Sequence, residues 1–424
     1  MGTPSPHHQR THIIAGAVGN VLEWFDFAAY GFFASVIGQQ FFPDDDKTLS
    51  LLAAFGVFAS GFLVRPIGAA FFGHLGDRKG REVVLRWSVI LMGLSTFGLG
   101  ALPSYHSIGV AAPILLTLLR MVQGFSVGGE FTGSIIYLVE NAAPNRRGSV
   151  GVWAFVGAII GMLAGSLTGA VINDVLTPEQ VASWGWRIPF LSGVSIMLVG
   201  AFFRCSLKAQ PVKSGPSRLP LWMAVKTEWP AMLKIMGMFL LGSAGFYMMF
   251  IYLTSYLHTE FGMAEGMALE INSISMLALL FCSLGWAWVS DQIGRKPVLL
   301  ISSIGCLLLT FPLFKLIQHE TAWFVFLGQL GFAVLIGATL GASTAVMVEN
   351  TRQAYRCSAV SLAYNITLAI FGGTTPMVAT WLIEETKNPL EPAYYLIVLS
   401  ALSTLAISLL PETHRRELDR DPAS

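Results

Sequence analysis

Charged side chains stand inside stretches of the sequence that are otherwise apolar. Glu23, Asp26, Arg120 and Glu130 are the clearest cases. A charge within an apolar membrane-spanning segment costs about 2.5–3.5 kcal/mol on insertion scales, so such residues are candidates for function. A carboxyl group held out of water can be neutral in one state and charged in another, and a nearby cation can couple that change to the binding of an anion. We therefore predict proton coupling at Glu23, Asp26 or Glu130.

The first apolar stretch carries a polar stripe. At 100° per residue, Asn20, Glu23, Asp26 and Tyr30 share about one third of a helix surface. A polar stripe on an apolar helix must face the interior of a bundle or a cavity. A structural pairing with arginine or the backbone is the alternative, and we favour a proton or substrate role for Glu23 or Asp26.

The fourth apolar stretch carries a narrower stripe, which consists of Arg120, Gln123, Val127, Glu130, Ser134 and Tyr137. Arg120 and Glu130 are about 15 Å apart along a helix, so each needs a partner elsewhere. A zwitterion offers an ammonium to a carboxylate and a carboxylate to Arg120. Neighbouring helices are expected to approach closely at the glycines of this stretch, which are Gly124, Gly128, Gly129 and Gly133.

The second half of the chain supplies aromatic and amide groups instead of charges. Aromatic faces there could stack on a quaternary ammonium, although packing and interfacial positions explain each single aromatic residue better. Arg65 and Arg187 are expected near opposite membrane faces, with their heads reaching the surface. The predicted substrate-binding residues are Asn20, Tyr30, Arg120, Gln123, Glu130, Tyr247, Tyr364 and Asn365.

Composition indicates which elements position these residues. Of the 424 residues, 54% are hydrophobic and 12% are charged, whereas soluble domains carry about 25% charged residues. This excludes a disordered chain and a soluble multidomain enzyme. A net charge of +1 provides no basic field for nucleic acid. Four cysteines without metal-ligand spacing predict no metal site, and we expect no cofactor.

Twelve apolar stretches are long enough to cross a membrane, since a spanning helix needs about 20 such residues. We predict an all-α membrane protein, in which the first stretch is a retained helix rather than a cleaved signal. The predicted spans are 12–40, 49–72, 83–102, 109–140, 149–173, 187–205, 230–258, 267–289, 297–316, 322–348, 357–384 and 391–410.

Lysine and arginine placement orients these spans. With a cytoplasmic N-terminus, most basic residues fall in inside loops, and the outside loops hold Lys47, Lys315 and Lys387. Positive charge favours the cytoplasmic side, so both termini are predicted there, in a cell inner (plasma) membrane. The predicted organisation is an N-terminal tail 1–11, a six-helix half 12–205, a linker 206–229, a second half 230–410 and a tail 411–424.

Two loops of the first half recur in the second half at a nearly constant offset. Asp77, Gly80 and Arg81 recur as Asp291, Gly294 and Arg295, and Glu140 and Arg147 recur as Glu349 and Arg356. Such duplication is typical of transporters that bind substrate between the repeats. The loops serve either as structural clamps or as a cytoplasmic gate of ion pairs. The predicted gate residues are Asp77, Arg78, Gly80, Arg81, Glu140, Arg147, Asp291, Arg295, Glu349 and Arg356.

These motifs resemble the major facilitator superfamily and, within it, the metabolite:proton symporters. The segments that carry the resemblance are Gly73–Arg81, Arg120–Gly124, Gly19–Phe27, Arg65-Pro66, Gln123–Glu130, Trp184–Pro189 and Phe371–Gly373. Phe131–Gly133, Tyr364–Ile366 and Pro392–Leu396 are most similar to the proline/betaine proton symporters. The resemblance implies two pseudo-symmetric six-helix halves that work by alternating access, in a protein that functions as a monomer.

The sequence departs from the family pattern at several positions. Glu82 stands where a basic residue is usual, and Ala287 and Gln292 replace a glycine and an arginine of the second loop copy. The two changes in the second copy predict a weaker second gate. The chain ends at Ser424 without the long coiled-coil tail of osmosensing relatives, so we expect no osmotic activation.

Proton-coupled import of a small zwitterion, such as proline, betaine or another amino acid, is the leading functional hypothesis. Symport of di- or tricarboxylates or other organic acids is one alternative, and proton-driven efflux is another. A membrane-embedded enzyme is less favoured. The Gly124-x-Ser126-x-Gly128 pattern of hydrolases lies inside a predicted span, where the required strand-to-helix turn does not fit. A receptor that no longer transports remains a further alternative, against which the buried charges argue.

Overall fold

The computed structural model describes residues 20–21, 23–79, 81–194, 220–353 and 355–418. Within these ranges the regular structure is helical, and no strand occurs. Nine helical segments of the described chain are long and apolar enough to cross a membrane. The predicted spans 12–40, 83–102 and 187–205 are not among them, because each includes residues or side chains outside the described part. The molecule is therefore a multi-pass helical membrane protein.

The first half begins with helical residues 20–21 and 23–32. It continues with α2 (Ala34–Phe41), α3 (Lys47–Lys79), α4 (Arg81–Ala101), α5 (Tyr105–Ile108), α6 (Ala111–Val127), α7 (Glu130–Glu140), α8 (Arg147–Gly151), α9 (Trp153–Val175), α10 (Pro178–Ser183), η1 (Gly185–Arg187) and α11 (Ile188–Leu191).

The second half comprises α13 (Pro220–Tyr247), η2 (Met248–Tyr252), α14 (Leu253–Phe261), α15 (Glu265–Ile293), α16 (Arg295–Ile317), α17 (Ala322–Glu349), α18 (Arg356–Thr367), η3 (Leu368–Gly372), α19 (Thr375–Thr386) and α20 (Glu391–Ser408). The short elements η2 and η3 are π-helical turns. They join α13 to α14 and α18 to α19.

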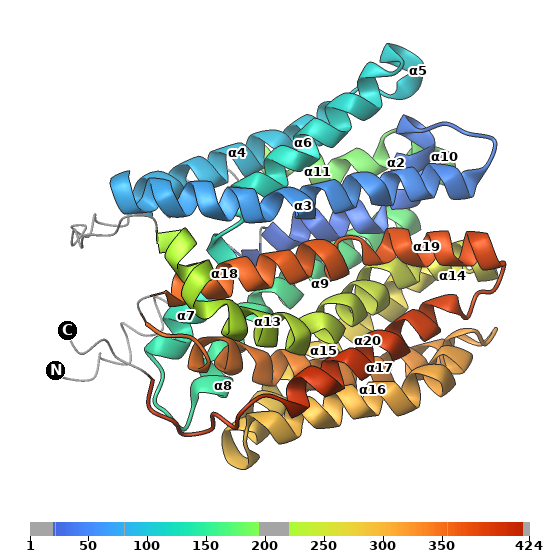
Figure 1. The fold of residues 1–424 in the computed structure, drawn as a ribbon. Coiled ribbons are helices and arrows are strands. Elements are labelled where there is room, and N and C mark those ends of the chain that lie inside the picture. Colours follow the sequence, from blue (N-terminus) through green and yellow to red (C-terminus); the bar gives the residue numbers. More distant parts are fainter. Residues whose placement is uncertain (1–19, 22, 80, 195–219, 354, 419–424) are drawn as a thin grey trace.

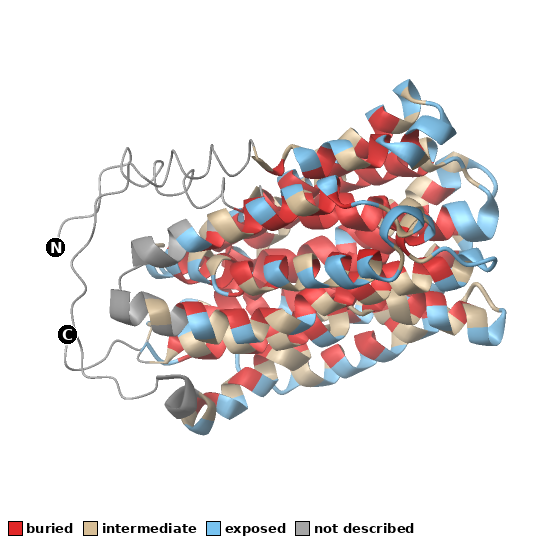
Figure 2. Cartoon of the chain, turned by 90° about the horizontal axis from the view of Figure 1, so that it is seen from above, coloured by how far each residue is buried: buried red, intermediate tan, exposed pale blue. Residues whose placement is uncertain are grey.

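The helices form two groups that pack along a common direction. Figure 1 shows α3, α4 and α6 on one side and α15, α16, α17 and α20 on the other, with α9, α18 and α19 between them. Buried residues fill the interior, and exposed residues lie mainly on the outer faces and at the loops (Figure 2). Many exposed outer residues are large and apolar, such as Phe281, Trp288 and Leu308, as expected of a surface that faces lipid.

Three helices are less regular than their hydropathy predicts. The fourth span breaks at Gly128–Gly129, between α6 and α7. The seventh and eleventh spans each contain a π-helical turn, a feature that is frequent at functional sites. The seventh helix already includes residues 220–229, which the sequence assigns to the linker.

Glycines bring α3 and α6 into backbone contact. A Cβ atom added at Gly124 would lie 1.7 Å from the carbonyl oxygen of Gly61, and one at Gly68 would lie 2.0 Å from that of Phe125. Gly128 also packs closely on α3, as predicted, since its added Cβ would lie 2.3 Å from the carbonyl oxygen of Arg65. The prediction is wrong for Gly129 and Gly133, where no atom of the described chain lies within 4 Å of an added Cβ. The break in the helix turns these two residues away from α3.

The glycines of α9 pack on the first helix. An added Cβ at Gly161 would lie 2.3 Å from the carbonyl oxygen of Val21, and one at Gly165 would lie 3.1 Å from Ala28. The four-residue spacing of these glycines is typical of a helix-packing face. This face holds the first helix, and with it the polar stripe, in the interior of the bundle.

Candidate transport site

Asp26 and Arg120 form a buried ion pair between the first helix and α6. Arg120 Nη1 lies 3.2 Å from Asp26 Oδ2, and both side chains are fully enclosed. Gln123 completes the arrangement, because its Nε2 donates to Asp26 at 2.6 Å and its Oε1 accepts from Arg120 at 2.8 Å. The same amide donates to Thr96 of α4 at 2.9 Å. Asp26, Arg120 and Gln123, which the sequence nominates separately, thus belong to one polar cluster.

Glu23 pairs with an arginine that the sequence assigns elsewhere. Arg65 of α3 is 1% exposed, and its Nη2 lies 3.1 Å from Glu23 Oε1. The prediction that Arg65 reaches a membrane surface is therefore wrong. Burial is possible because a carboxylate faces the guanidinium and aromatic rings cover it. In the sequence, Arg65 lies one helical turn from Gly61 and Gly68. Small residues at this spacing favour a face that packs on another helix, and this indicates that Arg65 is buried.

Aromatic rings surround both arginines. The Arg65 Cζ atom lies 4.4 Å from the ring centre of Phe27 and 4.5 Å from that of Phe62. The Arg120 Cζ atom lies 4.1 Å from the ring centre of Phe27. Phe27 therefore contacts both guanidinium groups. Cation–π attraction of this kind strengthens when water is excluded.

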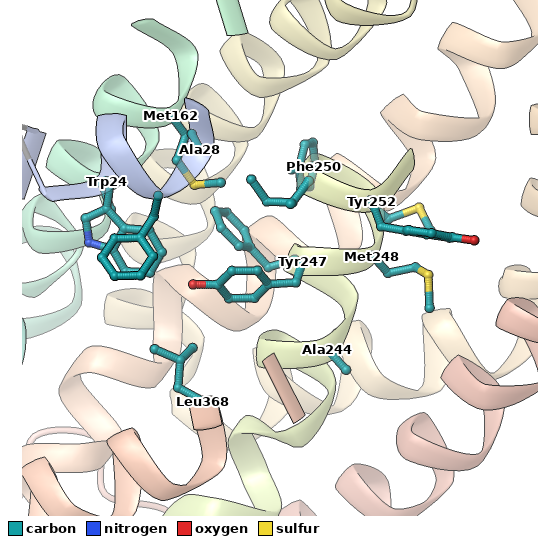
Figure 3. Packing of buried hydrophobic residues seen from close by; sticks show 14 of the residues in the cluster. Trp24, Ala28, Met162, Ala244, Tyr247, Met248, Phe250, Tyr252 and Leu368 are labelled. Atoms are coloured by element: carbon teal, nitrogen blue, oxygen red, sulfur yellow. The ribbon is translucent and has the colours of Figure 1, made fainter. Parts of the chain in front are cut away.

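Tyr247 brings the second half of the chain to this cluster. Its ring centre lies 5.3 Å from that of Phe62 and 6.3 Å from that of Trp24. Figure 3 shows the Tyr247 hydroxyl directed to the side on which Trp24 lies, with Leu368 of η3 nearby. The charged cluster of the first half therefore faces the irregular helices of the second half. A substrate site between repeats requires this arrangement.

Four other predicted substrate-binding residues have protein partners. Asn20 donates to Ser134 at 3.2 Å, and Tyr30 donates to the carbonyl oxygen of Ala54 at 3.1 Å. Asn365 donates to the carbonyl oxygen of Gly128 at 2.7 Å, which connects α18 to the break between α6 and α7.

Tyr364 packs its ring on an aromatic neighbour. Its ring stacks on that of Phe131, with the ring centres 5.3 Å apart. All four residues are buried, and the contacts described here position helices.

Glu130 begins α7, directly after the helix break. Its Oε2 accepts a hydrogen bond of 3.2 Å from Ser88 of α4. A carboxylate in the first turn of a helix is also stabilised by the helix dipole. The predicted continuous stripe ends here, because Tyr137 of α7 is 43% exposed.

Two amides of the second half were not recognised in the sequence. Gln329 of α17 donates to the carbonyl oxygen of Met249 and to Asn272, in both cases at 2.7 Å. Asn272 of α15 donates to the carbonyl oxygen of Phe250 at 3.3 Å. These amides satisfy carbonyl groups in the π-helical turn η2, where the regular hydrogen bonds are shifted. An amide within an apolar span is the only sequence signal for them.

Ion pairs connect the two halves at the end of the bundle where α7 and α8 meet (Figure 1). Asp291 of α15 accepts from the backbone nitrogens of Gly148 and Ser149, at 2.9 and 2.7 Å. These nitrogens start α8, so a carboxylate of one half caps a helix of the other. Arg295 holds Asp291 in place at 2.6 Å.

Two further ion pairs cross between the halves at the same end. Arg147 lies 3.5 Å from Glu349, which also pairs with Arg295 at 3.2 Å. Arg356 of α18 pairs with Glu140 of α7. Six of the predicted gate residues therefore form ion pairs at this end, four in one cluster and two in a separate pair. We call them together the gate network; its members are Glu140, Arg147, Asp291, Arg295, Glu349 and Arg356. Gly80 and the side chains of Asp77, Arg78 and Arg81 lie outside the part of the chain that the structure describes.

The segment 411–418 joins this network. Thr413 donates to Glu349 at 2.6 Å, and the carbonyl oxygen of Arg416 accepts from Arg147 at 2.6 Å. Glu412 accepts from the backbone nitrogens of Arg295 and Lys296, both at 3.0 Å, and so caps α16. Sequence reasoning assigned this segment only as a tail. Within the described residues, no group of His, Cys, Asp and Glu side chains could hold a metal ion.

Comparison with known proteins gives consistent results. The family model described as "Sugar (and other) transporter" matches residues 12–212 and 209–421. A glycine betaine/proline/ectoine/pipecolic acid transporter, OusA of Dickeya dadantii, is 36% identical over 96% of this chain and 84% of its own length. A proline/betaine transporter of Escherichia coli K12 is 34% identical over 96% of this chain and 85% of its own length.

The fold is that of solved transporters. The structure of XylE, a proton:xylose symporter of the major facilitator superfamily, covers 98% of both chains with a TM-score of 0.78 and 16% sequence identity. A D-xylose-proton symporter matches with a TM-score of 0.75 over 96% of this chain and 99% of its own. The fold therefore has twelve membrane-spanning helices in two halves, as predicted. The chain belongs to the sugar (and other) transporter family, and it has the fold of these solved symporters.

Proposed function

We propose that the protein is a secondary active transporter that imports a small zwitterion, proline or betaine, together with a proton. The observation that carries the proposal is the buried cluster of two carboxylates and two arginines between the first helix, α3 and α6. This cluster faces Tyr247 of the second half. The names of the relatives, which are transporters of betaine and proline, support this choice of substrate. Transport, not catalysis, is then the function of the chain.

Asp26 is the proposed proton site among the three candidate carboxylates. It pairs with Arg120 in a fully buried site, and Gln123 forms hydrogen bonds with both side chains. Protonation of Asp26 removes its attraction for Arg120 and so frees one partner of a buried pair, which is energetically costly unless the surroundings change. The protonation state is thereby coupled to the arrangement of the first helix and α6.

The gate network is the proposed cytoplasmic gate. Its pairs Arg147–Glu349 and Arg356–Glu140 cross from one six-helix half (12–205) to the other (230–410), and they must break when the halves rock apart at that end. We further propose that both termini and the linker 206–229 are cytoplasmic and that the protein lies in the inner (plasma) membrane. We also propose that it functions as a monomer and binds no nucleic acid. The placement of lysine and arginine supports this orientation.

Uptake by the purified full-length protein in proteoliposomes tests the function. With an acidic exterior, we expect labelled proline or betaine to accumulate, and a protonophore to abolish the accumulation. Unlabelled di- and tricarboxylates serve as competitors. Competition by these acids, without uptake of either zwitterion, would replace the proposal by organic-acid symport. Substrate extrusion driven by an inward proton gradient would replace it by efflux.

A further inference from the structure

The two buried ion pairs differ in how completely they are satisfied. Arg120 Nη1 binds both Asp26 and Gln123. Arg65 Nη2 is close to Glu23, but neither this atom nor Arg65 Nε makes a hydrogen bond to any described residue. Arg120 also has two nitrogens without a described partner, yet its charge is already shared by two neighbours. A buried guanidinium with unused donors can bind a carboxylate in a bidentate manner.

Further unused donors lie beside Arg65. The hydroxyl oxygen of Tyr247 and Nε1 of Trp24 are buried and have no hydrogen-bond partner among the described residues. Buried polar groups of native proteins nearly all have a partner, so those that lack one require an explanation. Trp24 comes from the first helix and Tyr247 from α13, so the donors belong to both halves. Together with Arg65 they provide the donors that a carboxylate needs.

The aromatic rings around Arg65 can also bind a cation. The faces of Phe27 and Phe62 lie 4.4 and 4.5 Å from the Arg65 Cζ atom, and the ring of Trp24 lies 5.6 Å from it. At present these faces hold the protein's own cation. Aromatic faces bind quaternary ammonium groups in the same manner. Glu23 supplies the negative charge on the other side of the guanidinium.

We propose that Arg65 binds the carboxylate of the substrate, while Glu23 and the faces of Phe27 and Phe62 bind its cationic nitrogen. The zwitterion inserts into the Glu23–Arg65 pair and turns one internal ion pair into two pairs with the substrate. Because the substrate has no net charge, the charge of the buried site does not change on binding. Arg120, which the sequence assigns to the substrate, then serves Asp26. This inference rests on the proposed function and assigns the substrate-binding residues within it.

Ligands that differ only in the carboxylate test the assignment. Glycine betaine carries a quaternary ammonium and a carboxylate, whereas choline carries the same ammonium and a hydroxyl group. Binding of labelled betaine to the full-length protein in lipid nanodiscs, without a pH gradient, gives its affinity, and competition gives that of choline. We expect Arg65→Gln to weaken betaine binding about 10- to 100-fold, the range for hydrogen bonds to charged groups. Choline binding should stay the same or strengthen, because Glu23 has lost its internal partner.

A second variant separates the cation site from the carboxylate site. Phe62→Leu keeps both charges, so it should weaken betaine and choline alike, about 3- to 30-fold, and leave their ratio unchanged. Phe55→Leu is the matched control, since Phe55 is equally buried but packs on Tyr252. It should change neither affinity. If Arg65→Gln does not fold, Arg65→Lys is the substitute, because lysine keeps the positive charge but lacks the paired N–H donors of the guanidinium. This variant should lower the ratio of betaine affinity to choline affinity by a smaller factor.

The possible results distinguish this inference from the proposed function. A wild-type protein that binds betaine, together with an unchanged betaine-to-choline ratio in the Arg65 variants, would overturn the assignment of Arg65 and leave the transport function intact. A wild-type protein that binds and takes up neither betaine nor proline would overturn the proposed function, and the inference with it. A ratio of betaine affinity to choline affinity that falls only in the Arg65 variants supports both the proposed function and the assignment of Arg65.

Discussion

At the scale of single residues, the charge of Asp26 determines the interactions of Arg120 and Gln123. It accepts from both Arg120 and Gln123 within a fully buried site. Asp26→Asn imitates the protonated state permanently. We expect this variant to lose accumulation driven by a pH gradient, while it still exchanges external for internal substrate. Uptake with and without a gradient, together with counterflow in the same proteoliposomes, measures the two activities.

Glu130→Gln is the control for Asp26→Asn, because it also replaces a carboxylate by an amide. Glu130 accepts a hydrogen bond from Ser88, which a glutamine oxygen can also accept. We therefore expect the gradient to remain effective in this variant. The reverse result, in which Glu130→Gln uncouples transport and Asp26→Asn does not, would move the proton site to the start of α7.

The sequence predicts the candidate residues better than their pairing. The cost of a charge in an apolar span singles out Asp26, Glu23 and Arg120 without any structure. Arg65 was placed at the surface, since helix periodicity cannot tell a guanidinium that reaches the interface from one that meets a carboxylate on another helix. Pairing depends on which helices are neighbours, and that is a property of the assembled bundle.

At the scale of elements, contact between α3 and α6 fixes the distance between Arg65 and Arg120. Gly124→Ala would place a methyl group 1.7 Å from the carbonyl oxygen of Gly61, so the helices must separate. We expect a loss of about 1–3 kcal/mol in stability, the usual cost of overpacking, and a lower melting temperature. Gly129→Ala is the control, because no described atom lies within 4 Å of its added Cβ. Equal melting temperatures for the two variants would show that this contact does not hold the helices together.

Helix irregularities explain why the sequence predicts the membrane spans but not the breaks and π-helical turns within them. Hydropathy identifies the spans, but it averages over the break at Gly128–Gly129 and over the π-helical turns. The turn η2 depends on Asn272 and Gln329 of other helices for its hydrogen bonds. Such tertiary partners have no signature within the segment that they stabilise. The irregular turns lie beside Tyr247 and Leu368, where the halves meet (Figure 3).

At the scale of the whole molecule, the gate network decides which side of the membrane can open. Arg356–Glu140 and Arg147–Glu349 cross between the halves. Replacing Glu140 and Arg147 by glutamine removes one partner of each pair, so the population should shift towards a state open at that end. A cysteine at Thr344, which faces Gly151 across the interface, should then react faster with a water-soluble maleimide. The four native cysteines are replaced beforehand.

An ion pair that does not cross the interface provides the control. Lys387 and Glu384 belong to one helix end and are solvent-exposed, so such a pair contributes little. Lys387→Gln should leave the labelling rate at position 344 unchanged. Equal labelling rates in the gate variant and in this control would show that the network does not limit opening.

Glu412 gives the contact between the segment 411–418 and α16 a dependence on pH. Burial raises the pKa of Glu412, but hydrogen bonds from the backbone nitrogens of Arg295, His414, Lys296 and Thr413 outweigh it and hold the pKa below the ordinary value of 4.5. A depressed pKa in the folded state means that the ionised group stabilises the protein above the ordinary pKa. That stabilisation is lost as the pH falls through the folded value.

Glu412→Gln should therefore melt at a lower temperature than the wild type at neutral pH, because the cap of α16 loses its charge at the helix N-terminus. The difference should shrink as the pH is lowered below about 4.5, since the wild-type carboxyl group is then protonated as well. Glu417→Gln, an exposed change in the same segment, controls for the loss of one negative charge. A difference in melting temperature that stays constant from neutral to acidic pH would mean that hydrogen-bond geometry, and not the charge of Glu412, holds the segment on α16.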